Sequence, residues 1–198
     1  MNKLFLLDAY ALIYRAYYAF IRAPRINSKG QNTSAIFGFV NTLEDVLKKE
    51  QPTHIGVAFD PKGPTFRHEL FEQYKAQREE TPEDIRASVP VIKDILRAYR
   101  IPILEVNGYE ADDVIGTLAH QADMLGIKTY MMTPDKDYGQ LVTENALIYR
   151  PKFGDKEFEV MGVERVKEKF GVEPTTAINF DPFGHTRGLV QILSKTGF

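Results

Sequence analysis

The chain alternates short apolar runs with longer segments of helical periodicity. Five runs have the length and character of strands, at residues 4–7, 54–59, 101–106, 128–132 and 146–149. Three longer segments repeat apolar side chains at the intervals of an amphipathic helix, at residues 33–49, 82–99 and 114–125. Strands that are separated by helices pair most simply as parallel neighbours. The order therefore predicts an α/β fold with a mainly parallel central sheet flanked by helices.

Composition limits the classes of protein to consider. With 198 residues, 43% hydrophobic and 26% charged, the chain has the balance of one globular domain. It has no cysteine, which excludes disulfide scaffolds, thiol nucleophiles and zinc–thiolate sites. No apolar run approaches the roughly 20 residues of a membrane-spanning helix, and Asp8 interrupts the first run before a signal-peptide core is complete. We therefore expect a soluble, cytoplasmic protein with no membrane partner.

Acidic side chains follow three of the predicted strands. Asp8 and Asp60 end their strands directly, and Asp135 and Asp137 come shortly after the strand at residues 128–132. In an open α/β sheet, ligands bind in the crevice beyond the carboxyl ends of the strands. The sequence therefore predicts a ligand site at this edge of the sheet.

A fourth acidic group, Glu110, Asp112 and Asp113, begins a predicted helix. Carboxylates at a helix start complement its dipole, so capping alone would explain this group. However, six or seven carboxylates that converge on one edge would repel one another, and divalent cations would relieve that repulsion. Oxygen ligands suit Mg²⁺ or Mn²⁺, and two such ions about 4 Å apart can activate a water and orient a phosphodiester. We therefore predict a site for two divalent ions.

Local charge indicates a polyanionic substrate, although the formal net charge is only −2. Residues 105–137 hold seven acids and two bases, whereas residues 1–35 hold five bases and one acid. Basic segments around an acidic centre suit a nuclease, in which bases hold the phosphate backbone and metal ions screen the acids. An ordinary solvated surface would also explain the basic segments.

Residues 61–82 form a polar stretch bounded by prolines, which we expect to be an insertion above the sheet. At near-helical spacing, Arg67, Tyr74 and Arg78 could face the carboxylates together. Aromatic rings stack on unpaired bases and cations bind phosphates, which favours a single-stranded nucleic acid as the ligand. A charged surface loop anchored by its phenylalanines is the alternative.

Four segments, in this order, resemble a known family. They read LLDAYALIYRAYYAF, GVAFDPKGPTFRHELFEQYKAQR, GYEADDVIGTLA and TPDKDYGQLV. Together they resemble the 5′–3′ exonuclease domain of bacterial DNA polymerase I, in the flap endonuclease superfamily with its PIN-like fold. The resemblance covers about residues 1–180. It implies a helical arch over the active site, and two-metal hydrolysis of DNA phosphodiesters in replication and repair. It also implies a monomer that acts on a 5′ single-strand flap or a nick, with an RNA primer as a further candidate.

The resemblance also implies roles for individual residues. The metal ligands would be Asp8, Asp60, Glu110, Asp112, Asp113, Asp135 and Asp137. Lys75 and Arg78 would be catalytic cations of the arch, close to the scissile phosphate. The substrate-binding residues would be Arg15, Tyr17, Tyr18, Arg67 and Tyr74.

The match fails after residue 180. The family continues with a motif whose two Asp residues complete the second metal site, followed by a helix-hairpin-helix, but this chain reads DPFGHTRGLVQILSKTGF. Codons for residues 182–190, read one nucleotide later, can spell Leu-Leu-Ala-Ile-Leu-Gly-Asp-Ser, which fits the family. We therefore expect residues 1–180 to be the catalytic domain and residues 181–198 to be a frameshifted tail, with impaired activity. A natural variant end is the alternative explanation.

Two other functions stay open from the sequence. A truncated nuclease could bind branched DNA without cutting it. A Mg²⁺ phosphatase of the haloacid dehalogenase type also has an Asp at the end of its first strand. That family needs a second acid two residues later, where this chain has Tyr10. Titration of Mg²⁺ and Mn²⁺ with flap DNA and a small phosphate ester separates the three functions.

Overall fold

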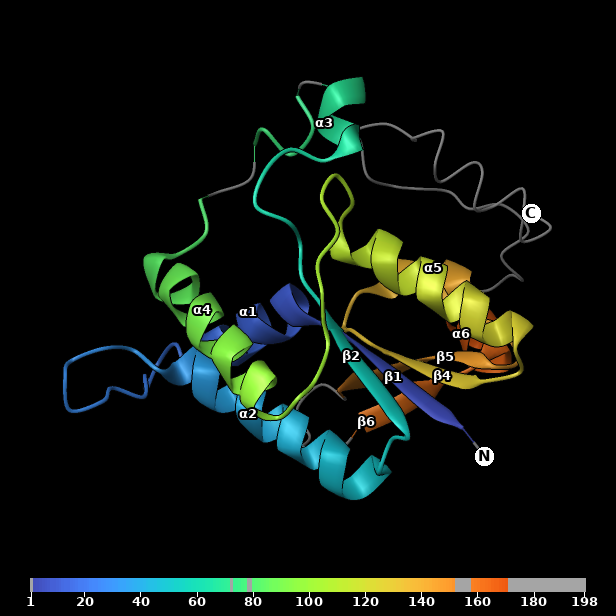
Figure 1. Ribbon diagram of the computed structural model, residues 1–198, viewed down its shortest axis with the longest axis horizontal. Coiled ribbons are helices and arrows are strands. Elements are labelled where there is room, and N and C mark those ends of the chain that lie inside the picture. The colour runs from blue at the N-terminus through green and yellow to red at the C-terminus, as the bar shows by residue number, and fades with distance from the viewer. Residues whose placement is uncertain (1, 72, 78–79, 152–157, 171–198) are drawn as a thin grey trace.

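A six-stranded sheet forms the centre of this computed structural model, which describes residues 2–71, 73–77, 80–151 and 158–170 (Figure 1). The strands lie side by side in the order β3-β2-β1-β4-β5-β6, and all neighbours are parallel except β5 and β6. Their bounds are β1 (Lys3–Asp8), β2 (His54–Ala58), β3 (Ile103–Leu104), β4 (Lys128–Met132), β5 (Ala146–Pro151) and β6 (Phe158–Met161). The predicted mainly parallel sheet is confirmed, and β6 was not predicted.

Helices cover both faces of the sheet (Figure 1). One face packs against α1 (Ala9–Ala19), α2 (Ser34–Asp45) with its π-helical extension η1 (Val46–Glu50), and α4 (Glu83–Ala98). The other face packs against α5 (Ala111–Met124), the 3₁₀ helix η2 (Lys136–Leu141) and α6 (Val163–Phe170). Within the part of the chain that the structure describes, no helix is both long and apolar enough to cross a membrane.

The central strand β1 is buried on both faces. Phe5 and Leu7 pack into the core beneath α1, α2 and α4, whereas Leu6 packs into the core beneath α5. The Phe5 ring also stacks on Tyr130 of β4, with ring centroids 4.8 Å apart. A parallel strand covered on both faces reads as a continuous apolar run, which is why the sequence identified this strand clearly.

Some predicted boundaries were wrong. The strand predicted at residues 101–106 is reduced to Ile103–Leu104 at the edge of the sheet, where only β2 can pair with it. The helix predicted from residue 114 begins at Ala111. Helix α1 was not predicted, although Asp8 begins it by accepting a hydrogen bond from the backbone of Ala11 at 3.1 Å.

The insertion at residues 61–82 lies above the sheet, as predicted, and carries the short helix α3 (Phe66–Leu70) (Figure 1). It is not one helix that presents Arg67 and Tyr74 together. The backbone becomes extended at Phe71, and Lys75 has a left-handed conformation with φ of 57°, which interrupts a right-handed helix. Arg78 lies outside the described residues. The insertion therefore approaches the sheet as a short helix and a turn.

We expect the contact between α1 and α2 to require glycine at position 38. A Cβ atom at Gly38 would lie 2.7 Å from the Cβ of Ala16, which is too close for two helices packed at this distance. The variant Gly38→Ala should lower the free energy of unfolding by about 1–2 kcal/mol, because the steric cost exceeds the roughly 1 kcal/mol gained in helix propensity. Denaturant unfolding measures this change. A double-mutant cycle with Ala16→Gly should show positive coupling, and purely additive effects would contradict the explanation.

Candidate functional site

Three predicted acids meet at the carboxyl edge of the sheet. Asp8 is the last residue of β1, Asp60 follows β2 and Asp135 follows β4. These strands are adjacent and parallel, so their ends lie at the same edge. The carboxylate of Asp8 interacts electrostatically with both Asp60 and Asp135. The structure thus brings these acids together, while their role as metal ligands stays a prediction.

Neutral donors hold two of these carboxylates. The N–H of Ala11 donates to Asp8 Oδ1 at 3.1 Å, and the Thr133 hydroxyl donates to Asp8 Oδ2 at 3.2 Å. The N–H of Ala111 donates to Asp60 Oδ1 at 2.7 Å. Among the described residues, neither Asp8 nor Asp60 forms an ion pair with a Lys or Arg side chain. Their negative charge is therefore not neutralised by a neighbouring cation.

Two of the carboxylates have strongly raised pKa values. Loss of hydration on burial raises the pKa of Asp8 from 3.8 to about 6; a backbone hydrogen bond opposes this rise and the charge of Asp60 adds to it. Asp112 lies in a crevice of about 90 Å³ whose lining includes Asp113 and Asp135. Its pKa rises to about 7, first because the carboxylate loses hydration and then because Asp113 is charged. Both groups favour a compensating positive charge near neutral pH.

Tyr138 is a residue of this site that the sequence analysis missed. Its side chain is 3% exposed, and its hydroxyl has no hydrogen-bond partner among the described residues. Burial raises the pKa of the hydroxyl well above its usual value, and the charges of Asp8, Asp112 and Asp135 add to this effect. The hydroxyl therefore keeps its proton and lies close to the acids. The sequence could have indicated Tyr138, because this residue directly follows Asp137 in the segment TPDKDYGQLV.

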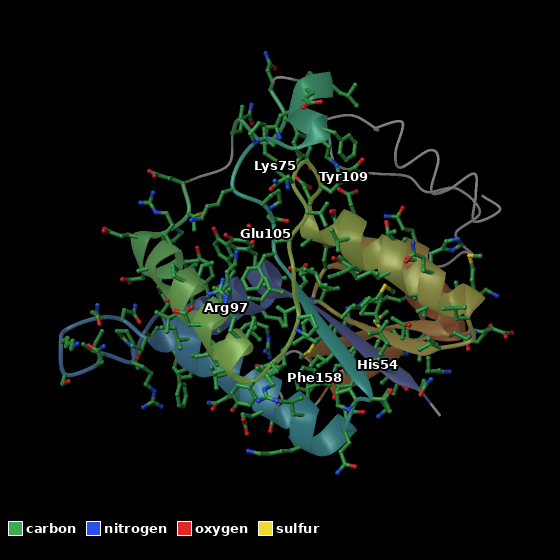
Figure 2. The ribbon with its side chains drawn as sticks, viewed as in Figure 1. His54, Lys75, Arg97, Glu105, Tyr109 and Phe158 are labelled. Carbon is green, nitrogen blue, oxygen red and sulfur yellow. The ribbon has the colours of Figure 1, made fainter. Side chains whose placement is uncertain are left out.

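The insertion is tied to the acids at the start of α5. The Arg67 guanidinium donates to both oxygens of Asp113, at 2.6 and 2.8 Å. The Lys75 ammonium donates to Glu110 Oε1 at 2.7 Å, and the Tyr74 hydroxyl donates to Glu110 Oε2 at 3.1 Å. Figure 2 shows Lys75 just beneath α3. Arg67, Lys75 and Tyr74 therefore lie over the acids and contact them directly, whereas Arg78 lies outside the described residues.

Asp113 also has a structural role, because the N–H of Glu110 donates to Asp113 Oδ2 at 3.0 Å at the start of α5. The capping explanation that the sequence left open therefore applies to this residue. Both oxygens of Asp113 are engaged by Arg67, whereas Asp112, one position earlier, has no cation bonded to it among the described residues. The two adjacent acids thus have different environments.

The other predicted site residues that the structure describes lie in two places. Asp137 lines the crevice that holds Asp112. Arg15, Tyr17 and Tyr18 lie on α1, about 10 Å or more along the helix from Asp8. The ring of Tyr18 contacts that of Tyr17, with centroids 5.3 Å apart, and is 55% exposed. The structure therefore does not bring this group of α1 residues to the acids, and no position is described for Arg78.

The donor chemistry of the site fits a hard divalent cation. Asp8, Asp60, Asp112 and Asp135 offer carboxylate oxygens without a cationic partner, and Tyr138 adds an unsatisfied buried hydroxyl. Among the described residues, however, no three acidic or histidine side chains are close enough to hold one ion together. Binding of an ion would therefore require movement of side chains at the sheet edge.

Comparison with known proteins places this chain in a family. A family model described as "5'-3' exonuclease, N-terminal resolvase-like domain" matches residues 3–171. The chain is 43% identical over 174 residues to a 5'-3' exonuclease of Aquifex aeolicus, which covers 88% of this chain and 58% of the relative. It is 40% identical over 179 residues to DNA polymerase I of Bacillus caldotenax, covering 90% of this chain and 20% of the relative. The chain thus spans about a fifth to just over half of these relatives.

Solved structures share the fold. The T5 D15 protein, co-crystallised with metal ions, gives a TM-score of 0.60 at 18% identity and covers 98% of this chain and 75% of its own. The T5 5'-exonuclease with bound zinc ions also gives 0.60, at 19% identity, over 87% of this chain and 62% of its own. The fold that the resemblance implied is therefore confirmed. Since the family model also spans most of the sequence, the chain belongs to the family of the 5'-3' exonuclease, N-terminal resolvase-like domain.

Proposed function

We propose that the chain hydrolyses DNA phosphodiesters with divalent metal ions, as a 5′–3′ exonuclease and 5′-flap endonuclease. The observation that carries this proposal is the convergence of carboxylates without cationic partners from β1, β2, β4 and α5 beneath a cationic insertion. The relatives named 5'-3' exonuclease and DNA polymerase I support the same activity. Its substrate would be DNA with a 5′ flap or a nick.

The acids without cationic partners are the first candidates to hold the ions. We propose Mg²⁺ or Mn²⁺, two ions, with Asp8, Asp60, Asp112 and Asp135 as the principal ligands. When bound, the ions would activate a water and stabilise the charge of the phosphodiester during hydrolysis. Glu110 and Asp113 could contribute oxygens only by weakening their bonds to Lys75 and Arg67.

In this proposal the cations of the insertion would also bind phosphates of the DNA, in addition to pairing with the acids. With Glu110 as its partner, Lys75 is held at the entrance to the acids with its side chain 22% exposed. A DNA phosphate that arrives there offers the ammonium an anionic oxygen in place of the carboxylate. Lys75 would then stabilise negative charge on the reacting phosphate, and Arg67 would hold the adjacent backbone. The same role for Arg78 stays a prediction from the sequence.

Asp112 provides the direct test of the proposed function. We expect Asp112→Asn to reduce metal-dependent cleavage of a 5′-flap duplex by at least about a hundredfold, because it removes a charged ligand. Binding of the same DNA without metal should be retained or improved, because repulsion falls. Single-turnover cleavage and fluorescence anisotropy measure the two effects. The control is Glu164→Gln, which changes an exposed side chain of α6 and should cut normally. Normal cleavage by Asp112→Asn would overturn the assignment.

Lys75 tests the role of the insertion. We expect Lys75→Gln to lower the single-turnover rate about a hundredfold to a thousandfold, the usual cost of losing one electrostatic donor to the transition state. Affinity for duplex DNA should change much less. The matched control is Lys49→Gln, which removes an exposed lysine at the end of η1. An unchanged rate would contradict this role and support the alternative that residues 61–82 are a charged surface loop.

The raised pKa of Asp8 predicts a pH-dependent stability. Its folded pKa of about 6 exceeds the model-compound value of 3.8, so the folded state binds this proton more tightly than the unfolded state. Without metal, this group therefore lowers the free energy of unfolding as pH rises from about 4 to about 7. We expect Asp8→Asn to be as stable as wild type near pH 4 and more stable above pH 7. Denaturant unfolding across this range with EDTA measures the difference.

Divalent ions should reverse this difference. At pH values above 7, millimolar Mg²⁺ or Mn²⁺ should raise the denaturant concentration at which half of the wild type is unfolded. The reason is that a ligand that binds only the folded state stabilises it. The same ions should raise the midpoint of Asp8→Asn much less. A stability difference independent of pH, together with equal metal responses, would contradict the role given to Asp8.

A further inference from the structure

The hydroxyl of Tyr138 stands apart from the other buried polar groups of the protein. Among the described residues, it is the one buried side-chain oxygen or nitrogen that has no hydrogen-bond partner. The side chain is 3% exposed, so solvent does not reach the hydroxyl either. Buried hydroxyl groups nearly always form a hydrogen bond, because an unpaired one has lost its contacts with water and gained none in return. We therefore looked for a partner that a change in the site would supply.

The ring of Tyr138 is fixed by the apolar core beneath α5. It packs in one group of buried side chains with Leu6 of β1, Ala58 of β2 and Ile115 of α5. Tyr138 also lies within the short helix η2, which holds its backbone. A side chain packed among three other elements has little freedom to turn away. The hydroxyl is therefore held in one place, and a partner has to move to it.

Strand geometry places two acids next to this ring. Side chains alternate between the two faces of a strand, so Asp8 lies on the same face of the sheet as Leu6, two residues earlier. Asp60 follows Ala58 by two residues and accepts a hydrogen bond from the N–H of Ala111, the first residue of α5. Both carboxylates thus lie on the face of the sheet that α5 covers, just beyond the residues on which the tyrosine ring packs.

The Tyr138 hydroxyl is close to the whole group of acids without cationic partners. The charges of Asp8, Asp60, Asp112 and Asp135 all act on it. Its ring also lines the crevice of about 90 Å³ to which Asp112 and Asp135 contribute. A carboxylate only accepts hydrogen bonds and a tyrosine hydroxyl donates one, and hydrogen bonds to a charged acceptor are roughly twice as strong as neutral ones. The nearby acids are therefore the natural partners of this hydroxyl.

Three of these acids have an oxygen to spare. Asp60 accepts a hydrogen bond through Oδ1, as described above. Asp112 Oδ1 accepts from the N–H of Asp113 at 2.8 Å, and Asp135 Oδ1 accepts from the N–H of Asp137 at 2.9 Å. Among the described residues, the second oxygen of each of the three accepts no hydrogen bond. Movement of a carboxylate toward Tyr138 would therefore add a bond without breaking one.

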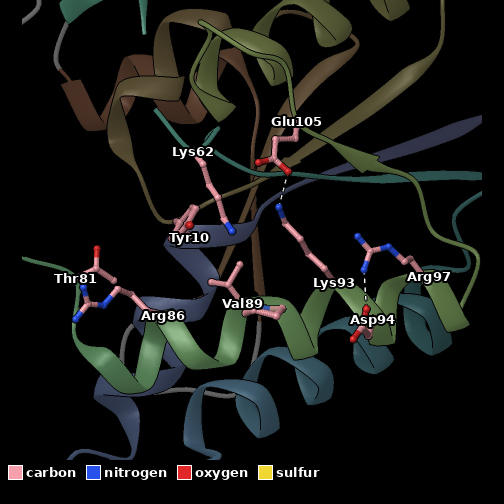
Figure 3. A pocket seen from close by; sticks show the side chains of 10 residues that line it. Tyr10, Lys62, Thr81, Arg86, Val89, Lys93, Asp94, Arg97 and Glu105 are labelled. Atoms are coloured by element: carbon pink, nitrogen blue, oxygen red, sulfur yellow. Dashed lines mark hydrogen bonds and ion pairs between the residues drawn. The ribbon is translucent and has the colours of Figure 1, made fainter. Parts of the chain in front are cut away.

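A second tyrosine near the same acids shows a different environment. Tyr10 follows Asp8 by two residues, and the charge of Asp60 acts on its hydroxyl. Together with Lys62, it lines a cavity beside α4 of about 720 Å³, whose walls carry several cations (Figure 3). Water can enter a polar cavity of this size and satisfy the Tyr10 hydroxyl. Proximity to the acids alone therefore does not explain the isolation of the Tyr138 hydroxyl.

We propose that Tyr138 is a positioning residue of the metal site, whose hydroxyl donates a hydrogen bond to one of these carboxylates when divalent ions draw the acids together. The inference rests on the proposed function, because it takes the acids as ligands of the ions. The bond would hold the carboxylate in the orientation that binds the ion. Groups that orient metal ligands in this way commonly contribute about tenfold to a hundredfold to metal affinity.

The test compares three variants of the full chain, each of which lacks one tyrosine hydroxyl. Tyr138→Phe removes the hydroxyl and keeps the ring in the core. Tyr10→Phe removes a hydroxyl that is near the acids but open to water. Tyr149→Phe removes a hydroxyl that donates to Glu50 at 3.0 Å, and Glu50 also binds Lys3 at the opposite end of β1 from Asp8. Calorimetry measures the affinity for Mg²⁺ and Mn²⁺, and denaturant unfolding in EDTA measures stability.

We expect Tyr138→Phe to bind either ion about tenfold more weakly than the wild type. Its unfolding midpoint in EDTA should equal or exceed that of the wild type, because the lost hydroxyl had no partner. Tyr149→Phe should show the opposite pattern, a lower midpoint and unchanged affinity for the ions. Tyr10→Phe should match the wild type in both measurements. A tyrosine that only fills the core would not lower metal affinity when replaced by phenylalanine.

A spectroscopic measurement follows the hydroxyl directly. In protein labelled with ¹³C at tyrosine Cζ, the resonance of Tyr138 is identified by its absence from Tyr138→Phe. It should shift on addition of Mg²⁺, because Cζ responds to a hydrogen bond at the attached oxygen. The resonance of Tyr149, whose hydroxyl already has a partner, should stay in place.

Equal ion affinities of Tyr138→Phe and the wild type would overturn the inference. So would a lower midpoint of Tyr138→Phe in EDTA with unchanged affinity, since the hydroxyl would then have a purely structural partner. In either case, Mg²⁺-dependent cleavage of flap DNA by the wild type, measured separately, would leave the proposed function standing. A wild type that neither binds divalent ions nor cuts flap DNA would overturn the function and the inference together.

Discussion

Repulsion among carboxylates at the end of a parallel sheet is the constraint on which the rest of the site depends. Parallel strands place Asp8, Asp60 and Asp135 at one edge, and burial of Asp8 leaves its charge poorly screened. The structure satisfies these groups in part with backbone and hydroxyl donors and leaves them without cations among the described residues. Repulsion of this kind is unfavourable without a compensating positive charge, which is the physical basis of the proposed metal site.

Cations of the insertion, which lies above the sheet, form ion pairs with some of the acids. Arg67 and Lys75 bind Asp113 and Glu110 at the start of α5. Asp112 has no cation bonded to it among the described residues, although both cations act on its charge from nearby. The insertion and the acids therefore hold each other in position. The proposed chemistry requires these cations to exchange carboxylate oxygens for phosphate oxygens, which links the arrival of DNA to rearrangement of the site.

The cavity beside α4 extends this distribution of charge. Acids lie at the strand ends, cations of the insertion lie over them, and further cations with an apolar wall lie one step away along β1 and β2. In the proposed function, this separation of positive from negative side chains would let a polyanion lie close to the carboxylates.

The sequence by itself determined the parallel sheet, the insertion and the acids at the strand ends, because buried parallel strands read as apolar runs and their last residues share one edge. Only the tertiary structure decided which acids are engaged, since Asp112 and Asp113 are neighbours in sequence but only Asp113 meets Arg67. It also decided that Arg67 and Tyr74 do not share a helix, and that Tyr138 is buried beside the acids. The periodicity of apolar residues predicts local backbone conformation and burial. Contacts between residues distant in the chain depend on how the helices and strands pack.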